Sequence, residues 1–264
     1  MVFCYTKIMK ELFIFTKKSI QACIFGASLL LVILLTQYIP LGGIARYDVI
    51  FISAIIFQTI FLVTKIETWK EVKVILLFHL VATVMELFKT SSSIGSWSYP
   101  SVGDAYFRLL TVPLFTGFLY SAVGSYISRA IRIFNMKFKN YPKQYIVGVI
   151  ALGIYINFFT HHYIYDFRYI LFGLILFFFW KTNIHFTVME KVRKMNFIIA
   201  GFLAAFFIWI VENIASYSNV WLYPDQVEYW KIVSFQKIGS WFLLLIISFL
   251  LVSLIYRNRL TEKN

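Results

Sequence analysis

Long apolar runs recur along the whole chain, and they constrain its fold more than any other feature. An α-helix needs about 20 predominantly apolar residues to cross a bilayer, and runs of roughly that length alternate here with short polar segments. They predict eight transmembrane helices at residues 21–39, 47–64, 73–89, 106–128, 145–160, 168–180, 196–213 and 239–256. The predicted fold class is therefore an all-α, polytopic transmembrane helical bundle, with residues 1–264 forming a single integral membrane domain.

The composition excludes several other classes of protein. Hydrophobic residues make up 60% of the chain and charged residues only 14%, whereas about a quarter of the residues in soluble domains are charged. Transmembrane β-barrels are built from short segments of alternating polarity, which this chain lacks. The formal charge of +13 would suit nucleic acid, but Lys and Arg gather at the ends of apolar runs, as topology signals do. We therefore expect the lipid bilayer as partner and no nucleic acid.

The distribution of Lys and Arg predicts the orientation. Of the 25 basic residues, 19 fall in segments on the N-terminal side of the predicted bundle and 6 on the other side. Cytoplasmic loops carry the excess of Lys and Arg, so we expect a multi-pass protein of the cell (cytoplasmic) membrane with both termini cytoplasmic. The basic N-terminus resembles a signal peptide, but the run 21–39 exceeds the roughly 7–15 apolar residues of such a peptide. An uncleaved first span is favoured.

Two segments of similar sequence predict an internal repeat. "ELFKTSSSIGSWSYP" begins at Glu86, and "VENIASYSNVWLYPD" contains Glu212. In both, a Glu closes an apolar run and the pattern Trp-x-Tyr-Pro follows. Four spans per copy would leave both copies in the same orientation. The sequence therefore predicts two parallel four-helix repeats, roughly 19–140 and 141–257, related by an axis along the membrane normal.

The repeated residues form the predicted site. Arg46 and Arg168 each open a span, so parallel repeats would place them with Glu86 and Glu212 near the outer leaflet. Ionisable residues at the edge of a span are costly unless paired or hydrated, and one Arg and one Glu per half could offset each other's burial. We expect Glu86 and Glu212 to be the candidate catalytic groups. The candidate substrate-binding residues are Arg46, Arg168, Trp97, Tyr99, Trp221, Tyr223, Asn157 and His161. The alternative is that the repeated residues only anchor the bundle within an aromatic belt.

Other polar residues suggest further roles. His161, His162 and Asp166 could form a metal site with a Glu, because imidazole and carboxylate suit zinc or iron. No signature such as His-Glu-x-x-His supports it, so the sequence predicts no metal and identifies no cofactor. In the fourth span, Gly117, Ser121 and Ser125 form a stripe of small residues that predicts close helix packing. Basic residues at 129–143 are expected to meet anionic lipid headgroups.

Several segments carry a resemblance to a known family. "MELFKTSSSIGSWSYP", "VPLFTGFLYSAVGSYISRA", "NFFTHHYIYDFRY", "VENIASYSNVWLYP" and "KIGSWFLLLIISFLLV" resemble the bacterial membrane-protein family catalogued as domain of unknown function 817. The resemblance covers nearly the whole chain and implies a compact multi-pass membrane protein.

A looser similarity is to membrane carotenoid cyclase and hydratase proteins. They also place a Glu before a Trp/Tyr-rich turn and a Val-Pro-Leu-like helix start, which Glu86, Trp97, Tyr99 and residues 112–114 match. The chain departs from that pattern because it lacks an Asp one turn after Glu86 and has no Pro-x-Glu-Glu segment.

Three functions fit this sequence. The first is a membrane enzyme that acts on a lipid or isoprenoid, with Glu86 or Glu212 as general acid and Arg46 or Arg168 binding a phosphate or carboxylate head. The second is a small-molecule transporter with a cavity between the halves. The third is an accessory structural membrane protein without a substrate site.

Overall fold

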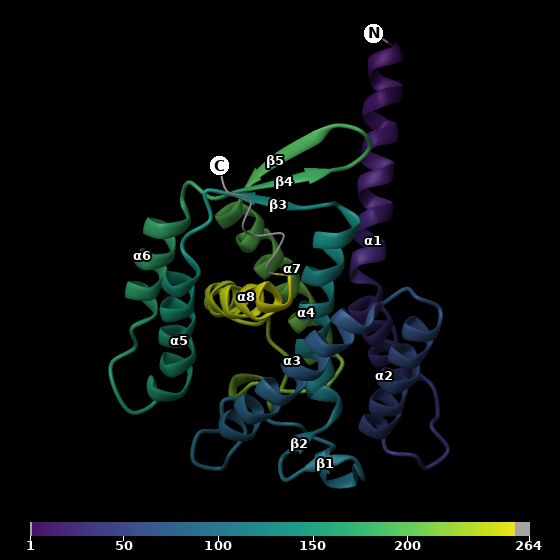
Figure 1. Cartoon of the computed structure of the whole chain (residues 1–264). Coiled ribbons are helices and arrows are strands. Elements are labelled where there is room, and N and C mark those ends of the chain that lie inside the picture. Colours follow the sequence, from purple (N-terminus) through teal and green to yellow (C-terminus); the bar gives the residue numbers. More distant parts are fainter. Residues whose placement is uncertain (1, 257–264) are drawn as a thin grey trace.

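A computed structural model describes residues 2–256, which form eight α-helices and five short β-strands (Figure 1). The helices are α1 (Val2–Tyr38), α2 (Arg46–Val63), α3 (Trp69–Lys89), α4 (Phe115–Ile133), α5 (Gln144–Thr160), α6 (Arg168–Phe179), α7 (Phe197–Tyr217) and α8 (Gln236–Ile255). The strands are β1 (Arg108–Leu109), β2 (Val112–Pro113), β3 (Lys137–Lys139), β4 (Asn183–Thr187) and β5 (Val192–Asn196). The fold is mostly helical as predicted, but the strands make it not purely α.

Four helices of the described chain are long and apolar enough to cross a membrane. They comprise Ile8–Tyr38 of α1, all of α2 and α7, and Gln236–Ser253 of α8. α5 and α6 are apolar but have only 17 and 12 residues, fewer than the roughly 20 that a bilayer requires. α3 carries Lys and Glu at both ends, and α4 is rich in Ser and Gly. Length and composition thus support a membrane protein.

Two helices begin far from their predicted boundaries: α1 begins at Val2 instead of residue 21, and α4 begins at Phe115 instead of residue 106. A helix was expected from residue 106, but Arg108–Leu109 pairs with Val112–Pro113 in an antiparallel hairpin, and α4 begins only at Phe115. Proline inside a helix removes a hydrogen bond and clashes with the preceding turn, at a cost of about 3 kcal/mol. Pro113 is therefore tolerated at the edge of the hairpin, and the helix begins after it.

The strands mark the two ends of the bundle (Figure 1). β3, β4 and β5 form an antiparallel sheet at one end, beside the N-terminal half of α1. The β1–β2 hairpin lies at the opposite end, and we call these the sheet end and the loop end. Arg193 of β5 forms an ion pair of 2.5 Å with Glu11 of α1, and Lys18 Nζ donates a 2.9 Å hydrogen bond to the Thr187 carbonyl. These contacts attach the sheet to α1.

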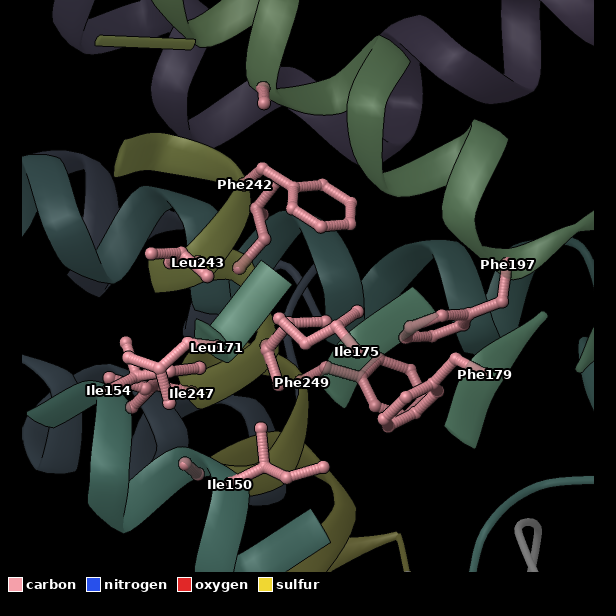
Figure 2. Close-up of a cluster of buried hydrophobic side chains, with 14 of the residues drawn as sticks. Ile150, Ile154, Leu171, Ile175, Phe179, Phe197, Phe242, Leu243, Ile247 and Phe249 are labelled. Carbon is pink, nitrogen blue, oxygen red and sulfur yellow. The ribbon is translucent and has the colours of Figure 1, made fainter. Parts of the chain in front are cut away.

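α8 is the central helix. In its most apolar window 56% of the residues are buried, against 22%, 28% and 22% for the windows of α1, α2 and α7. Figure 2 shows the largest hydrophobic cluster, where Phe242, Ile247 and Phe249 of α8 pack among side chains of α5, α6 and α7. Smaller clusters lie between α1, α2 and α4.

The small residues of α4 pack against α3, as the sequence predicted. A Cβ atom on Gly117 would overlap the imidazole of His79. Ser121 Oγ donates to the Ile75 carbonyl at 2.8 Å, and Ser125 Oγ donates to Glu67 at 2.7 Å. α4 and α3 approach so closely because small residues face α3 along this stripe.

Candidate functional site

Glu86, one turn before the end of α3, accepts three side-chain hydrogen bonds. Trp97 Nε1 and the Tyr99 hydroxyl donate to Oε2 at 2.9 and 2.7 Å, and the Tyr120 hydroxyl of α4 donates to Oε1 at 2.8 Å. The residue is 1% exposed. Both carboxylate oxygens are therefore satisfied within the protein, and they hold the first Trp-x-Tyr-Pro segment against α3.

Glu212, near the end of α7, has a similar position but fewer partners. The Tyr223 hydroxyl donates to Oε1 at 2.5 Å, as Tyr99 does to Glu86. The residue is 5% exposed, and the side chain of Trp241 on α8 approaches its carboxyl group. Its Oε2 is buried without a close hydrogen-bond partner among the described residues. A buried carboxylate oxygen without a donor is energetically unfavourable, so Oε2 is available to a bound molecule.

The two Trp-x-Tyr-Pro segments contact each other at the loop end. Ser98 and Leu222, the middle residues of the two patterns, form an antiparallel bridge. Lys237, in the first turn of α8, faces an aromatic ring from each segment. Its Nζ is 4.1 Å from the ring centre of Tyr223 and 5.4 Å from that of Trp97, within the range of cation–π attraction.

A cavity of about 1250 Å³ lies beside these residues. Its walls come mainly from α1, α4, α7 and α8, and most of them are apolar, including Ala122, Ala204 and Leu244. The ionisable side chains are concentrated at the loop end. Those that line the cavity there are Glu86, Lys89, His161, Arg168, Glu212 and Lys237.

The cavity continues to the sheet end and to the lipid-facing surface. Phe186 of β4 and Met195 of β5 line its far end. Ile20 of α1 and Phe207 of α7 also line it and are exposed on the outside of the bundle. The cavity is thus long and amphipathic, with one polar end and a side that opens between α1 and α7.

Arg46 does not belong to this cavity. Its guanidinium donates to the carbonyls of Ile33 and Ser218 at 2.9 and 2.6 Å, and to Thr36 Oγ1 at 3.3 Å. Arg46 therefore satisfies carbonyls at the ends of α1 and α7. It pairs with no Glu, so the expected Arg–Glu pair of the first half is wrong.

Arg168 lines the cavity, but its ion pair is with Asp166 and not with Glu212, which was expected. Its Nε lies 2.6 Å from Asp166 Oδ2. Asn157 donates to the other Asp166 oxygen at 3.0 Å. Burial alone would raise the pKa of Asp166, but these hydrogen bonds and the Arg168 charge outweigh it and lower that pKa.

His161 and His162 face the ammonium of Lys89. Their Nε2 atoms lie 3.4 and 2.6 Å from Lys89 Nζ. Partial burial and the Lys89 charge lower the pKa of His162 to about 4. Within residues 2–256, no cluster of three or more His, Cys, Asp or Glu side chains could hold a metal ion. The weak metal candidates His161, His162 and Asp166 do not form a site, because a cation from the protein already occupies the position between the imidazoles.

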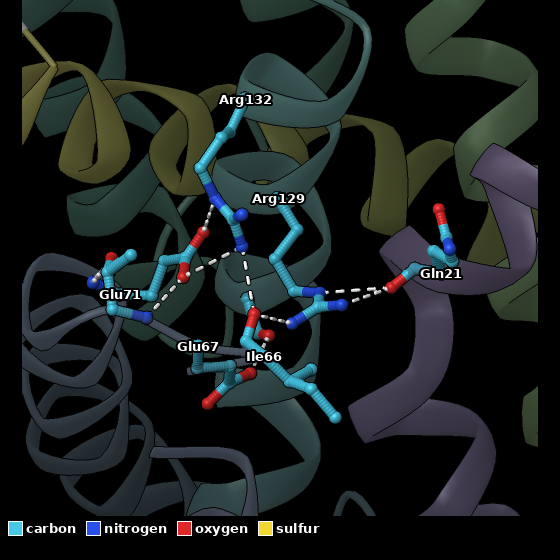
Figure 3. A network of polar contacts seen from close by, with 8 residues as sticks. Gln21, Ile66, Glu67, Glu71, Arg129 and Arg132 are labelled. Carbon is cyan, nitrogen blue, oxygen red and sulfur yellow. Dashed lines mark hydrogen bonds and ion pairs between the residues drawn. The ribbon is translucent and has the colours of Figure 1, made fainter. Parts of the chain in front are cut away.

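Figure 3 shows a second polar cluster, which is formed by residues other than those of the predicted site. Arg129 of α4 is 3% exposed and donates to the carbonyls of Gln21 and Ile66, while Arg132 pairs with Glu71 at 3.0 Å. The sequence assigned these arginines to lipid headgroups. Arg129 instead joins α1, α4 and the α2–α3 turn, since buried carbonyls need donors.

Sequence reasoning missed three residues that complete the candidate site. Tyr120 binds Glu86, and its ring lies 5.8 Å from that of Trp241 on α8. Aromatic residues in apolar helices are too common to single these two out from sequence. Lys237 did carry a signal, because it belongs to the few basic residues on the predicted outer side.

Comparison with known proteins now identifies the family. The family model described as "Protein of unknown function (DUF817)" matches residues 11–249. The chain belongs to this family. It is also 38% identical over 247 residues to the "Uncharacterized protein YoaT" of Bacillus subtilis (strain 168). The matched region covers 94% of this chain and 92% of the relative. No solved structure matches the chain. The similarity to carotenoid cyclases and hydratases finds no support in these comparisons.

Proposed function

We propose that this member of the family is a multi-pass protein of the cell membrane that binds a lipid or isoprenoid in its central cavity. The observation that carries the proposal is the shape and polarity of the cavity. Its walls are apolar over most of their length, and its ionisable groups lie at one end. An amphiphile has the same division between a long apolar tail and a polar head, and ligand pockets are typically apolar with a few placed polar groups.

The proposal extends to the arrangement in the membrane. All eight helices would span it as two parallel repeats, residues 19–140 and 141–257, of which residue 257 lies outside the described part. The equivalent bonds from Tyr99 to Glu86 and from Tyr223 to Glu212 support this. The loop-charge bias supports cytoplasmic termini, with the loop end outward.

Within this site, Glu212 is the carboxyl group that we assign to the ligand. Glu86 has donors on both oxygens, whereas Glu212 Oε2 has none among the described residues. If the protein is an enzyme, Glu212 is the group able to exchange a proton with the bound molecule. Glu86 would then position the Trp-x-Tyr-Pro segment.

The test is the identity of the amphiphile that remains bound to the full-length protein after detergent purification. Organic extraction and mass spectrometry would compare the wild type with Ala204→Trp, which places an indole in the cavity. Leu152→Trp is the matched control, because Leu152 is exposed on α5 and does not line the cavity. We expect Ala204→Trp to lose the bound molecule and the control to retain it. Equal amounts in all three folded proteins would contradict the proposal.

Transport is the second candidate, because the cavity has lining residues at both the loop end and the sheet end. The extracted amphiphile would be incorporated into one leaflet of proteoliposomes. Movement to the other leaflet that depends on the protein would favour transport. Chemical conversion of the amphiphile would favour an enzyme.

A further inference from the structure

Three basic side chains from different helices meet at the polar end of the cavity. Lys89 closes α3, Arg168 opens α6 and Lys237 lies in the first turn of α8, and all three line the cavity. Lys89 is close enough to both of the others to interact electrostatically with them. Repulsion between like charges is strong where water is excluded, so this grouping needs a compensating charge.

The protein supplies only part of that charge. Arg168 has its ion pair with Asp166, but within the described residues neither lysine has a carboxylate oxygen within 4.0 Å. Lys89 is 4% exposed, and among residues 2–256 its ammonium contacts only the two imidazoles and the ring of Phe158, whose centre is 4.3 Å away. Lys237 lies over the rings of Trp97 and Tyr223, and the carboxyl groups of Glu212 and Glu86 attract it from a distance longer than that of an ion pair. A buried ammonium without an anion is unfavourable.

We propose that the polar end of the cavity binds the anionic head of the amphiphile, a phosphate or a carboxylate, between Lys89, Lys237 and Arg168. This inference rests on the proposed function, because the apolar remainder of the cavity would hold the tail. An oxyanion accepts charge-assisted hydrogen bonds from ammonium and guanidinium groups. It would supply the missing negative charge without any rearrangement of the three helices.

The same end of the cavity also provides an acceptor. Glu212 Oε2 has no donor among the described residues, and it belongs to a residue close enough to Lys237 to interact electrostatically. A head that carries a hydroxyl group beside its anionic oxygens would satisfy this acceptor as well. Glycerol phosphate has both groups.

The test is a binding measurement on the full-length protein in detergent, by native mass spectrometry and by the ligand-induced rise in the unfolding temperature. The probes are phosphatidylglycerol, phosphatidylcholine with the same acyl chains, and inorganic phosphate. We expect phosphatidylglycerol to bind at least tenfold more tightly than phosphatidylcholine, and inorganic phosphate to bind far more weakly than either. Lys89→Met and Lys237→Met should each reduce the preference about tenfold, which corresponds to about 1.4 kcal/mol.

Lys231→Met is the matched control. Lys231 is exposed at the loop end, lies over the ring of Tyr229 and does not line the cavity, so its loss should leave the preference unchanged. If the methionine variants do not fold, Lys89→Arg and Lys237→Arg keep the charge and should keep the preference.

The outcomes separate the two proposals. Absence of binding by both lipids would overturn the proposed function itself. Equal binding of the two lipids, unaffected by the lysine substitutions, would contradict the recognition of an anionic head group but remain consistent with a lipid-binding site. If inorganic phosphate binds as tightly as phosphatidylglycerol, the cationic site is supported, but the proposal that its ligand is an amphiphile is contradicted.

Discussion

Ser98 and Leu222 exchange two backbone hydrogen bonds, each 2.9 Å long, from the N–H of one residue to the carbonyl of the other. They occupy the same position in the two Trp-x-Tyr-Pro patterns and are 124 positions apart in the sequence. The bridge joins segments that follow α3 and α7, so it holds Glu86 and Glu212 at the same end of the bundle.

This bridge can be tested by crosslinking. Antiparallel residues that exchange both hydrogen bonds have Cα atoms about 5.5 Å apart, within the range that a disulfide spans. We expect Ser98→Cys/Leu222→Cys, in a background with Cys4 and Cys23 replaced by Ser, to form an intramolecular disulfide on mild oxidation. Intact-mass analysis and mobility on non-reducing gels would detect it. The single-cysteine variants serve as controls, and a double variant that remains fully reduced would disprove the pairing.

The two glutamates should differ in their contribution to stability. Among the described residues, Glu86 accepts three close hydrogen bonds from side chains, whereas Glu212 accepts one from Tyr223 and has Trp241 nearby. A hydrogen bond to a charged group contributes about 1.5–3 kcal/mol. Glu86→Gln should therefore lower the apparent unfolding temperature clearly more than Glu212→Gln. Tryptophan fluorescence during heating would measure it, with the exposed Glu228→Gln as control. Equal losses for both would show that Glu86 is not the more strongly bound carboxylate.

Gly117 should tolerate no side chain. A Cβ there would overlap the His79 ring, whereas a Cβ on Gly148, in the middle of α5, would meet no atom within 4 Å. Overpacking typically lowers the free energy of unfolding by about 1–3 kcal/mol. In a helix interior without such a clash, replacing Gly by Ala raises it by up to about 1 kcal/mol. We expect Gly117→Ala to be destabilised and Gly148→Ala to be unchanged or stabilised in thermal unfolding. The double variant Gly117→Ala/His79→Ala should recover part of the loss, and no recovery would argue against the His79 contact.

Stability should fall in mild acid because of His162. Its folded pKa of about 4 lies below the ordinary value of 6.5, so the unfolded chain binds the proton more tightly than the folded one. The stabilisation is present above about pH 6.5 and is lost as the pH falls toward 4. His162 is exposed, so solvent screening limits the size of the effect.

His162→Ala would test this, because it should flatten the dependence of unfolding temperature on pH between those values. His161, Lys89 and Asp166 surround the ring and remain in the variant. His185 on β4 lies at the sheet end and is half-buried, and burial together with the charges of Lys139 and Lys194 also lowers its pKa. His185→Ala should therefore flatten the acid dependence independently, and it measures how much of the effect arises away from His162. An unchanged acid dependence in His162→Ala would show that other groups cause it.

The helices could be read from the sequence with useful accuracy. Runs of apolar residues predicted all eight helices of the described chain, because hydrophobic periodicity and length are local properties. The strands were not predicted. β4 and β5 lie in a charged loop and pair with each other, and β4 also pairs with β3, a segment more than 40 residues earlier.

The candidate site was predicted in part for the same reason. The sequence marked Glu86, Glu212 and the two Trp-x-Tyr-Pro segments, because a repeated pattern is visible in the chain itself. It could not assign partners, so Arg46 was placed with Glu86, although its guanidinium binds backbone carbonyls of α1 and α7. Every residue has a backbone carbonyl, so the sequence does not reveal which carbonyl will accept a hydrogen bond from a distant arginine.

The sequence by itself determined a helical, membrane-like chain and the residues that recur in it. Only the tertiary structure decided that Lys89, Arg168 and Lys237 line one end of one cavity. It also decided that both oxygens of Glu86 accept hydrogen bonds, whereas Glu212 Oε2 has no close donor in the described part of the chain. Hydrophobic patterning acts over neighbouring residues. Electrostatics and hydrogen bonding depend instead on distances between atoms of different helices, which exist only once those helices have packed.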